Sequence, residues 1–170
     1  MTAAPLRVRD ATLADAEQIA AVHVDSWRET YSTMLPSRVL DGNTLARREH
    51  MWRAILAAQP VLGATAVVVD EEKIVGFAFA AGSGHPDARR NAAPVRDLHL
   101  FSLYVLEDAH RRGAGTALLE RVLGTGPAQL WVLRENTGAR RFYERRGFAE
   151  DGVTFTDPDL DGAVELRMVR

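Results

Sequence analysis

A turn that carries two arginines and two glycines is the first part of this chain whose residue types suggest chemistry. Its seven residues are His110, Arg111, Arg112, Gly113, Ala114, Gly115 and Thr116. Backbone N–H groups at the start of a helix, together with the helix dipole, bind phosphate well, and glycine permits close approach. We therefore predict a site for a diphosphate or polyphosphate here; the alternative is a connecting turn that binds nothing.

Two better-known phosphate motifs do not fit these residues. A Walker A loop requires a lysine directly after its last glycine, and no lysine follows Gly115. A dinucleotide-binding loop requires a third glycine, at the position that Leu118 occupies. The turn is therefore not expected to bind a nucleotide in either of these ways.

A second group of residues lies further along the chain, on a predicted helix that begins near Asn136. Tyr143 is seven residues beyond Asn136, so at about 100° per residue the two lie nearly in line, two turns apart. An asparagine at a helix start commonly serves only as an N-cap, and a helical tyrosine commonly belongs to the core. The presence of this pair in the same chain as the phosphate turn favours a functional role for both residues.

The rest of the chain supplies the elements that must position these residues. Alternating and β-branched runs predict strands over residues 6–10, 64–70, 73–81, 97–106, 129–133, 153–156 and 164–169. Helical periodicity predicts one helix that begins at Thr12, with Asp15 as its capping-box partner, and others over 44–58, 115–124 and 136–146, with a loop over 82–94. This order predicts an α/β (α+β) fold, with a mostly antiparallel, mixed sheet of six to seven strands and helices on both faces. Residues 1–170 are expected to form a single domain.

Composition excludes several functional classes. The chain has no cysteine, which rules out disulfides, thiolate metal sites and cysteine nucleophiles. Its formal net charge of −2 gives no general attraction to nucleic acid or to an anionic membrane. No apolar run approaches the roughly 20 residues that a membrane helix needs, and the N-terminus has no apolar signal-peptide core. The five histidines are scattered, so we expect no metal site, and we expect a cytoplasmic protein that binds neither nucleic acid nor membrane.

In both motifs the chain resembles the GNAT superfamily of acyl-CoA-dependent N-acetyltransferases, and the resemblance covers most of the chain. The first family motif, Gln/Arg-x-x-Gly-x-Gly/Ala after a strand ending in L-x-V, corresponds to residues 110–115 after Leu103, Tyr104 and Val105. His110 stands where glutamine or arginine is usual. The second motif, Asn-x-x-Ala-x-x-Φ-Tyr-x-x-x-Gly-Phe with Φ apolar, is matched almost completely by residues 136–148. Residues 23–31 are more weakly similar to the polyamine and phosphinothricin acetyltransferase type.

The resemblance implies a GNAT-like fold and a site for acetyl-CoA, which serves as the acyl donor. The pyrophosphate would bind the N–H groups of residues 111–116, and the pantetheine arm would bind the strand edge at residues 103–105. That strand would diverge from the strand over 129–133 to admit the arm. Asn136 would bind the arm from the other side, and the small Ala139 would leave room for it. Arg140 would reach a phosphate or would belong only to a solvated face.

The resemblance also implies direct attack of an amine on the thioester, with two candidate catalytic residues. A tyrosine beside the sulfur can donate a proton or a hydrogen bond to the leaving thiolate, which is the role implied for Tyr143. Many family members have a glutamate as water-mediated base on the strand before L-x-V, and His99 occupies the matching position. We expect residues 99, 101, 103 and 105 to share one strand face. A structural role is the alternative for His99, and His85 ranks below it as a base.

The acceptor site is expected between the first two helices and the loop before residue 97. Trp27 and Tyr31 recur at helical spacing and would either line this site or belong only to the core. The sequence therefore predicts an N-acetyltransferase for the primary amine of a small molecule. Two alternatives stay open, an acetyltransferase for protein N-termini or lysines and a non-catalytic acyl-CoA-binding sensor module. A homodimer is a further expectation, since dimers are common among similar proteins.

Overall fold

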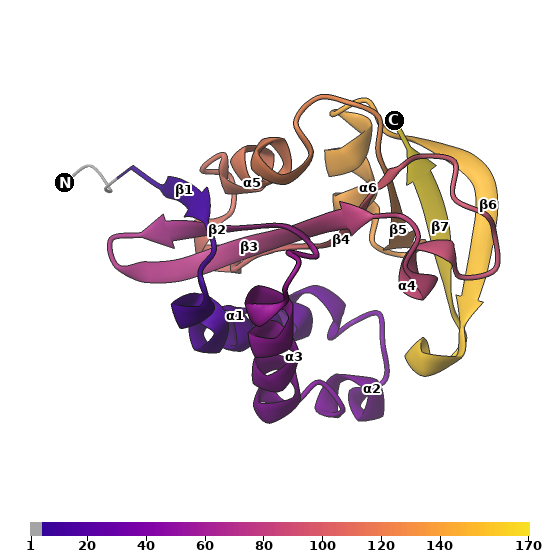
Figure 1. Cartoon of the computed structure of the whole chain (residues 1–170). Coiled ribbons are helices and arrows are strands. Elements are labelled where there is room, and N and C mark those ends of the chain that lie inside the picture. Colours follow the sequence, from indigo (N-terminus) through magenta and orange to yellow (C-terminus); the bar gives the residue numbers. More distant parts are fainter. Residues whose placement is uncertain (1–4) are drawn as a thin grey trace.

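A computed structural model describes residues 5–170, which form a seven-stranded mixed sheet with helices on both faces (Figure 1). The strands are β1 (Arg7–Asp10), β2 (Gly63–Asp70), β3 (Lys73–Gly82), β4 (Leu98–Val105), β5 (Gln129–Leu133), β6 (Ala149–Asp157) and β7 (Ala163–Val169). Their order across the sheet is β1-β2-β3-β4-β5-β7-β6. Neighbouring strands are antiparallel except β4 and β5, which are parallel. The predicted fold class is therefore confirmed.

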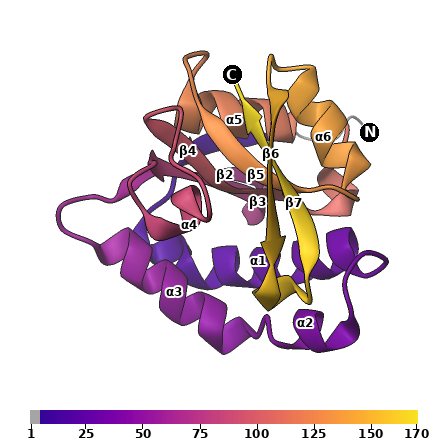
Figure 2. The ribbon, with the colours of Figure 1, turned by 90° about the vertical axis from the view of Figure 1, so that its right-hand side faces the viewer.

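The longer helices are α1 (Ala16–Tyr31), α3 (Leu45–Ala57), α5 (Ala114–Leu123) and α6 (Thr137–Glu144). In Figure 1, α1 and α3 lie below the sheet and α5 and α6 lie above it, and Figure 2 shows the same layers from the β6–β7 edge. The sequence did not predict the short helices α2 (Ser37–Asp41) and α4 (Pro86–Arg89), because their prolines indicated only a break or a loop. Short 3-10 turns are η1 (Leu13–Asp15), η2 (Glu107–Ala109) and η3 (Pro158–Leu160). No helix within residues 5–170 has the length and apolar character needed to cross a membrane.

The first helical segment begins at a capping box, as the sequence predicts. Asp15 Oδ2 accepts a hydrogen bond from the Thr12 backbone N–H at 2.7 Å, and Arg9 Nη1 lies 2.7 Å from the same oxygen. The guanidinium of Arg9 lowers the pKa of Asp15 to about 2, so the carboxylate stays charged at neutral pH. This polar anchor fixes the start of α1, which then places Trp27 and Tyr31 near its other end.

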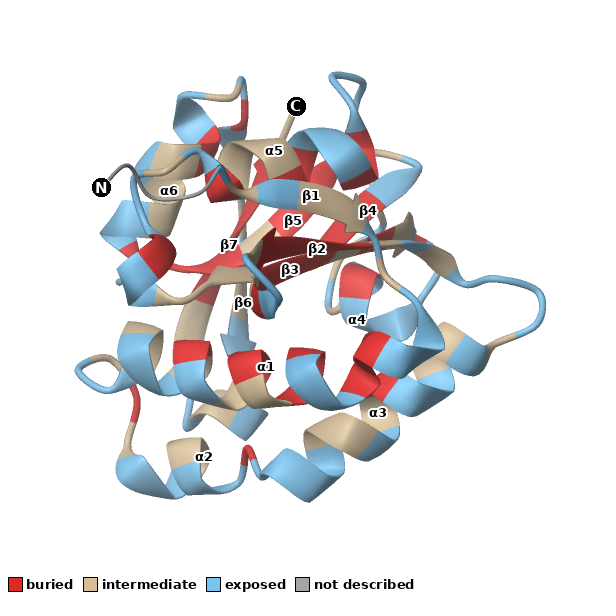
Figure 3. Cartoon of the chain, turned by 90° about the vertical axis from the view of Figure 1, so that its left-hand side faces the viewer, coloured by how far each residue is buried: buried red, intermediate tan, exposed pale blue. Residues whose placement is uncertain are grey.

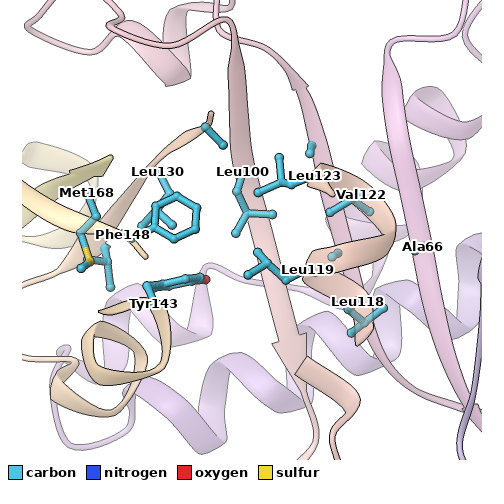
Figure 4. Close-up of a cluster of buried hydrophobic side chains, with 14 of the residues drawn as sticks. Ala66, Leu100, Leu118, Leu119, Val122, Leu123, Leu130, Tyr143, Phe148 and Met168 are labelled. Atoms are coloured by element: carbon cyan, nitrogen blue, oxygen red, sulfur yellow. The ribbon is translucent and has the colours of Figure 1, made fainter. Parts of the chain in front are cut away.

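Buried residues form two hydrophobic clusters, one on each face of the sheet. Figure 3 marks the buried positions on the strands and helices in red. The cluster beneath α5 and α6 includes Leu118, Leu119 and Tyr143, and Figure 4 shows it in detail. The cluster between the sheet and the α1 and α3 helices includes Trp52 and Phe77. Because both clusters contain residues of β2 and β3, helices on opposite faces are held against the same strands.

Strands β4 and β5 pair at only two positions among the described residues. His99 pairs with Gln129, and Leu100 pairs with Leu130. Beyond Leu100 the two strands diverge, as the family resemblance implied, while β4 remains paired with β3 as far as Val105. An unpaired strand edge of this kind offers backbone N–H and C=O groups to a ligand.

Candidate active site

A cavity of about 1610 Å³ lies where β4 and β5 diverge. Residues of α1, α3, β4, β5, α5 and α6 line it, so side chains from both faces of the sheet meet in one space. The volume exceeds the roughly 300–1,000 Å³ that is usual for a single small-ligand site. The cavity therefore has room for a cofactor and a second substrate together.

The predicted phosphate turn forms one end of this cavity. Gly113 has a left-handed backbone (φ 81°, ψ 0°) immediately before α5, a conformation that glycine adopts without strain. No side chain within residues 5–170 caps the first turn of α5, so its N–H groups are available to an anion. Gly115 allows α5 to approach α6 closely, because a Cβ at this position would lie 3.1 Å from the ring of Phe142.

Arg146 adds a positive charge beside the turn. Its guanidinium carbon lies 3.8 Å from the centroid of the Phe142 ring, and its Nη2 donates a hydrogen bond to the Thr116 hydroxyl. Burial lowers the pKa of Arg146 below its usual value, although a guanidinium remains charged at neutral pH. Its Nε is buried without a partner among the described residues. The side chain is thus a fixed cation next to the N-terminus of α5.

Three other arginines of the two motifs differ in where their side chains lie. Arg111 is exposed and lines the cavity. Arg112 forms an ion pair with Asp70 of β2, with 2.5 Å between Nη1 and Oδ2. Arg140 is held by Glu150 at 2.5 Å and donates a hydrogen bond to the backbone carbonyl of residue 134. Neither Arg112 nor Arg140 lines the cavity.

Tyr143 extends from α6 into the core beneath α5 and α6, and it also lines the cavity. The residue is 8% exposed, and in Figure 4 its hydroxyl end is directed toward the strand that carries Leu100. Burial raises the pKa of the phenol well above its usual value, so the hydroxyl keeps its proton. Asn136 begins the same helix, where its Oδ1 accepts a hydrogen bond from the Ala139 N–H at 3.1 Å. Asn136 therefore both caps α6 and lines the cavity.

Three aromatic side chains form the wall of the cavity near α1, and we call Trp27, Tyr31 and Tyr104 the aromatic box. The Tyr104 hydroxyl accepts a hydrogen bond from Trp27 Nε1 at 3.0 Å and lies 3.0 Å from the Tyr31 hydroxyl. Burial raises the pKa of both tyrosines, so both phenols are neutral at physiological pH. Aromatic faces and neutral hydroxyl groups suit an amine-bearing ligand.

His99 is buried in the cavity wall. Its Nδ1 lies 3.3 Å from Gln129 Nε2, and its ring packs on Phe101 with the ring centroids 4.6 Å apart. Burial, together with the positive charge of Arg90, lowers the pKa of His99 to about 3. The imidazole is therefore neutral at pH 7 and is a weak proton acceptor there.

The expectation that residues 99, 101, 103 and 105 share one face of β4 is wrong. Phe101 is an extra residue in the strand, because Leu100 and Ser102 pair with consecutive residues of β3. This bulge places Leu100 in the same cluster as Leu103 and Val105, beneath α5 and α6. His99, the neighbour of Leu100, consequently faces the side of the sheet that carries the aromatic box.

Glu165 of β7 is a buried carboxyl group that the sequence reasoning missed. Its side chain is 9% exposed and lines the cavity, and its Oε2 lies 2.9 Å from Arg90 Nη2 without hydrogen-bond geometry. Arg90 also contacts Asp157 at 3.0 Å. Burial raises the pKa of Glu165 to about 7, although Arg90 opposes that change. Glu165 can therefore take up or release a proton near neutral pH.

Residues 23–148 match the family model described as the acetyltransferase (GNAT) family. The chain belongs to the GNAT family of acetyltransferases. A Mycobacterium tuberculosis protein named as a probable N-acetyltransferase is 30% identical to this acetyltransferase over 174 residues, which cover 92% of this chain and 87% of the relative. An uncharacterized N-acetyltransferase of Bacillus subtilis is 34% identical over 135 residues, which cover 76% of this chain and 72% of the relative. The protein is therefore an enzyme of the acyltransferase class.

Solved structures of lower sequence identity share the fold of this acetyltransferase. The PaiA N-acetyltransferase from Thermoplasma acidophilum, solved in complex with coenzyme A, has a TM-score of 0.68 at 15% identity over 96% of this chain and 98% of that one. An acetyltransferase from Thermus thermophilus has a TM-score of 0.64 at 24% identity over 100% and 99% of the two chains. The GNAT-like fold therefore extends over nearly the whole chain.

Most residues that the two motifs and the first helix nominate do line the cavity of this acetyltransferase. They are Trp27, Tyr31, His99, Leu103, Tyr104, Val105, His110, Arg111, Gly113, Ala114, Gly115, Thr116, Asn136, Ala139 and Tyr143. The side chains of Arg112 and Arg140 do not, because carboxylates outside the cavity hold both guanidinium groups. Only the backbone N–H of Arg112 remains a candidate for phosphate binding. No group of three histidine, aspartate or glutamate side chains within residues 5–170 gathers as a metal site would require.

Sequence reasoning missed several charged residues of the cavity, namely Arg48, Arg90, Arg146 and Glu165. Arg146 had a usable signal, since it lies four residues after Phe142 within the helix predicted over 136–146. Glu165 also had one, because it is a carboxylate in a run over 163–169 that is apolar apart from Glu165 and Arg167. Arg48 and Arg90 had no such signal in the sequence. Their partners, which are Trp27 and Asp157 respectively, lie far away along the chain.

Proposed function

We propose that this acetyltransferase moves an acetyl group from acetyl-CoA to the primary amine of a small molecule. One observation carries the proposal, namely that a single cavity joins the glycine turn before α5 to the aromatic box at the opening between β4 and β5. The turn suits a pyrophosphate, the unpaired strand edge suits an amide-rich arm, and the aromatic box suits an amine. The coenzyme A complex of the PaiA protein supports the same cofactor for this chain.

Acetyl-CoA would contact both motifs along this cavity. The N–H groups of residues 111–116 would bind the pyrophosphate, with the guanidinium of Arg146 beside them. The edge of β4 at residues 103–105 would bind the pantetheine arm as an added strand. Asn136 would donate from its amide nitrogen, because its oxygen is already occupied in capping α6.

The reaction forms one C–N bond and breaks one C–S bond. The neutral amine attacks the thioester carbon, the tetrahedral intermediate expels the CoA thiolate, and the amine nitrogen loses one proton. Because burial raises the pKa of Tyr143, the phenol would stabilise the departing thiolate chiefly by donating a hydrogen bond. The proton released by the amine balances the proton that the thiolate finally takes up.

Two buried groups are candidates for the proton acceptor. His99, the residue nominated by the sequence, would act through a water molecule, but a pKa of about 3 makes it a weak acceptor. Glu165, with a pKa of about 7, is closer to the value that favours proton transfer at neutral pH. Since both residues line the cavity, the pH dependence of turnover in variants of each decides between them.

The cofactor part of the proposal is tested by thermal unfolding with acetyl-CoA, with ATP and NAD as controls. At a ligand concentration 100-fold above Kd, acetyl-CoA should stabilise the folded protein by about 2.7 kcal/mol. The controls should give no comparable shift, because the turn lacks the lysine and the third glycine of their motifs. A folded, cofactor-free protein that acetyl-CoA fails to stabilise would refute the proposal.

The catalytic part of the proposal is tested with Tyr143→Phe in an assay of thiol release from acetyl-CoA. The variant should keep the thermal shift with acetyl-CoA and lose about a hundredfold in kcat. Unchanged turnover would remove Tyr143 from the mechanism. The assay should include peptides with free N-termini or lysines beside small amines. Acetylation of peptides alone would favour a protein substrate, and binding without turnover of any amine would favour a sensor.

A further inference from the structure

Arg48 of α3 places a guanidinium in the wall of the cavity, on the same side of the sheet as the aromatic box. Its Nε donates a hydrogen bond to Asn43 Oδ1, and its Nη1 lies 3.5 Å from Met51 Sδ. The guanidinium carbon lies 5.5 Å from the centroid of the Trp27 ring. These neutral contacts hold the positive charge in place but do not neutralise it.

Arg48 has no carboxylate within ion-pair distance in the described part of the chain. Three other buried or partly buried arginines do have one, since Arg9 pairs with Asp15, Arg90 with Asp157 and Arg167 with Asp151. The burial of Arg48 lowers its pKa, which reflects the loss of solvation around its charge. A partly buried cation with only neutral partners is costly, and an anionic group bound beside it would offset that cost.

The donors that Arg48 still has available suit a carboxylate. Its Nη2 makes no hydrogen bond to residues 5–170, and Nη1 has only the weak thioether contact with Met51. A guanidinium fixed in this way can present two parallel N–H groups to a planar carboxylate. The contacts with Asn43 and Trp27 restrict the side chain, so little conformational freedom is lost when a ligand binds.

Acetyl-CoA phosphates are not the anion that this position would meet. The phosphate turn begins α5 on one face of the sheet, whereas α3 covers the opposite face (Figure 1). The turn has its own cation in Arg146. The anion that reaches Arg48 would therefore belong to the acceptor, which occupies the part of the cavity beside the aromatic box.

A carboxyl group for the amine end of such an acceptor is also present. Glu165 lines the same cavity from β7, and its charge and that of Arg48 both act on the hydroxyl of Tyr104. The aromatic box thus lies within electrostatic range of one fixed cation and one carboxyl group. An acceptor with both an ammonium and a carboxylate complements this arrangement, whereas a simple amine would leave Arg48 without a counter-charge.

We propose that the acceptor is an amine that also carries a carboxylate, as an amino acid does, and that Arg48 binds this carboxylate while Glu165 faces the amine. The inference rests on the proposed function, because it names the class of acceptor for the same cavity. It identifies Arg48 as a specificity-determining residue that acts through binding and takes no part in the chemical step.

The test compares amino acids with the amines that remain when their carboxylate is removed. Phenylalanine is paired with phenethylamine, and methionine with 3-(methylthio)propylamine, in the thiol-release assay with acetyl-CoA. The wild type should prefer the amino acid of at least one pair in kcat/KM. Arg48→Gln should reduce that preference about tenfold to a hundredfold, the usual range for losing a hydrogen bond to a charged group. Arg48→Lys should fall between the two, because it keeps the charge without the planar fork.

The control is Arg47→Gln, a change at an exposed arginine that is next in sequence and does not line the cavity. It should leave the preference unchanged. Three results would overturn the inference: acetylation of the simple amines as efficiently as the amino acids, an equal loss on both members of each pair in Arg48→Gln, or no acetylation of either amino acid. If acetyl-CoA still raises the unfolding temperature of the protein, the cofactor assignment holds in all three cases. If acetyl-CoA gives no such shift, the proposed function itself is refuted.

Discussion

Replacement of Glu165 by glutamine should stabilise the protein above neutral pH, although it removes a contact with Arg90. The pKa of Glu165 is about 7 in the folded protein and 4.5 ordinarily. Between these values the folded state keeps a proton that the unfolded chain releases, so the free energy of unfolding falls as pH rises. The difference between the two pKa values corresponds to a change of about 3 kcal/mol in the free energy of unfolding.

The glutamine variant isolates this effect, because glutamine resembles the protonated carboxyl group and does not titrate. Below pH 4.5 the two proteins should therefore have nearly equal free energies of unfolding. Above pH 7 the variant should be more stable by up to about 3 kcal/mol. The groups that face Glu165 are Arg90, Asp157, Tyr31 and Tyr104. Arg90 keeps its 3.0 Å contact with Asp157 in the variant, so it is not left without a counter-charge.

Urea unfolding of both proteins at intervals from pH 4 to 8.5 measures the difference directly. Glu72→Gln, at the exposed turn between β2 and β3, is the matched control, and its effect should be within about 0.5 kcal/mol throughout. A difference between wild type and Glu165→Gln that does not grow between pH 4.5 and 7 would refute the reasoning. A variant that is less stable at every pH would show instead that the contact with Arg90 outweighs the cost of burying the carboxylate.

Other predictions concern the base and the glycine turn. His99 has a pKa of about 3 in the folded protein against 6.5 ordinarily, so it contributes stability that is present above pH 6.5 and lost as pH falls toward 3. Urea titrations of His99→Gln should lack that contribution, and an unchanged pH dependence would contradict the burial argument. In turnover, Glu165→Gln should abolish the rise of kcat/KM through about pH 7 while His99→Gln keeps it, and the opposite result would assign the base to His99. Gly115→Ala should weaken acetyl-CoA binding, because its methyl would lie 3.1 Å from Phe142 and the ring would have to shift. Gly126→Ala, where the added methyl meets nothing within 4 Å, is the control, and equal effects of the two changes would refute the packing argument.

The parts of the fold that the sequence predicted correctly depend on local signals. Thr12 and Asp15 cap the first helical segment as their spacing indicates. Asn136 begins α6, and Gly113 adopts the positive φ expected of a glycine before a helix. Each of these features is decided by residues within a few positions of one another, which is why a single sequence was sufficient.

The bulge in β4 shows where local reasoning fails. Strict alternation put His99 on the face of Leu103 and Val105, yet Phe101 is an extra residue that reverses the assignment. Nothing in the run over 98–105 marks Phe101 as the extra residue, because every position there is compatible with a strand. The bulge is visible only in the register between β3 and β4, a relation between distant segments.

The two ends of the cavity also differ in whether their residues come from neighbouring or from distant parts of the sequence. At the phosphate end, Gly113, Gly115 and Arg146 lie in or next to the two motifs, so the chemistry could be inferred from spacing. At the acceptor end, Arg48 and Glu165 come from α3 and β7 and have no motif in common. The net charge of −2 gives no indication of these two residues, because the charges of an arginine and a glutamate cancel when they are summed. The cofactor of this acetyltransferase could therefore be predicted from local sequence, whereas the proposal for its acceptor rests on charges that only the fold brings together.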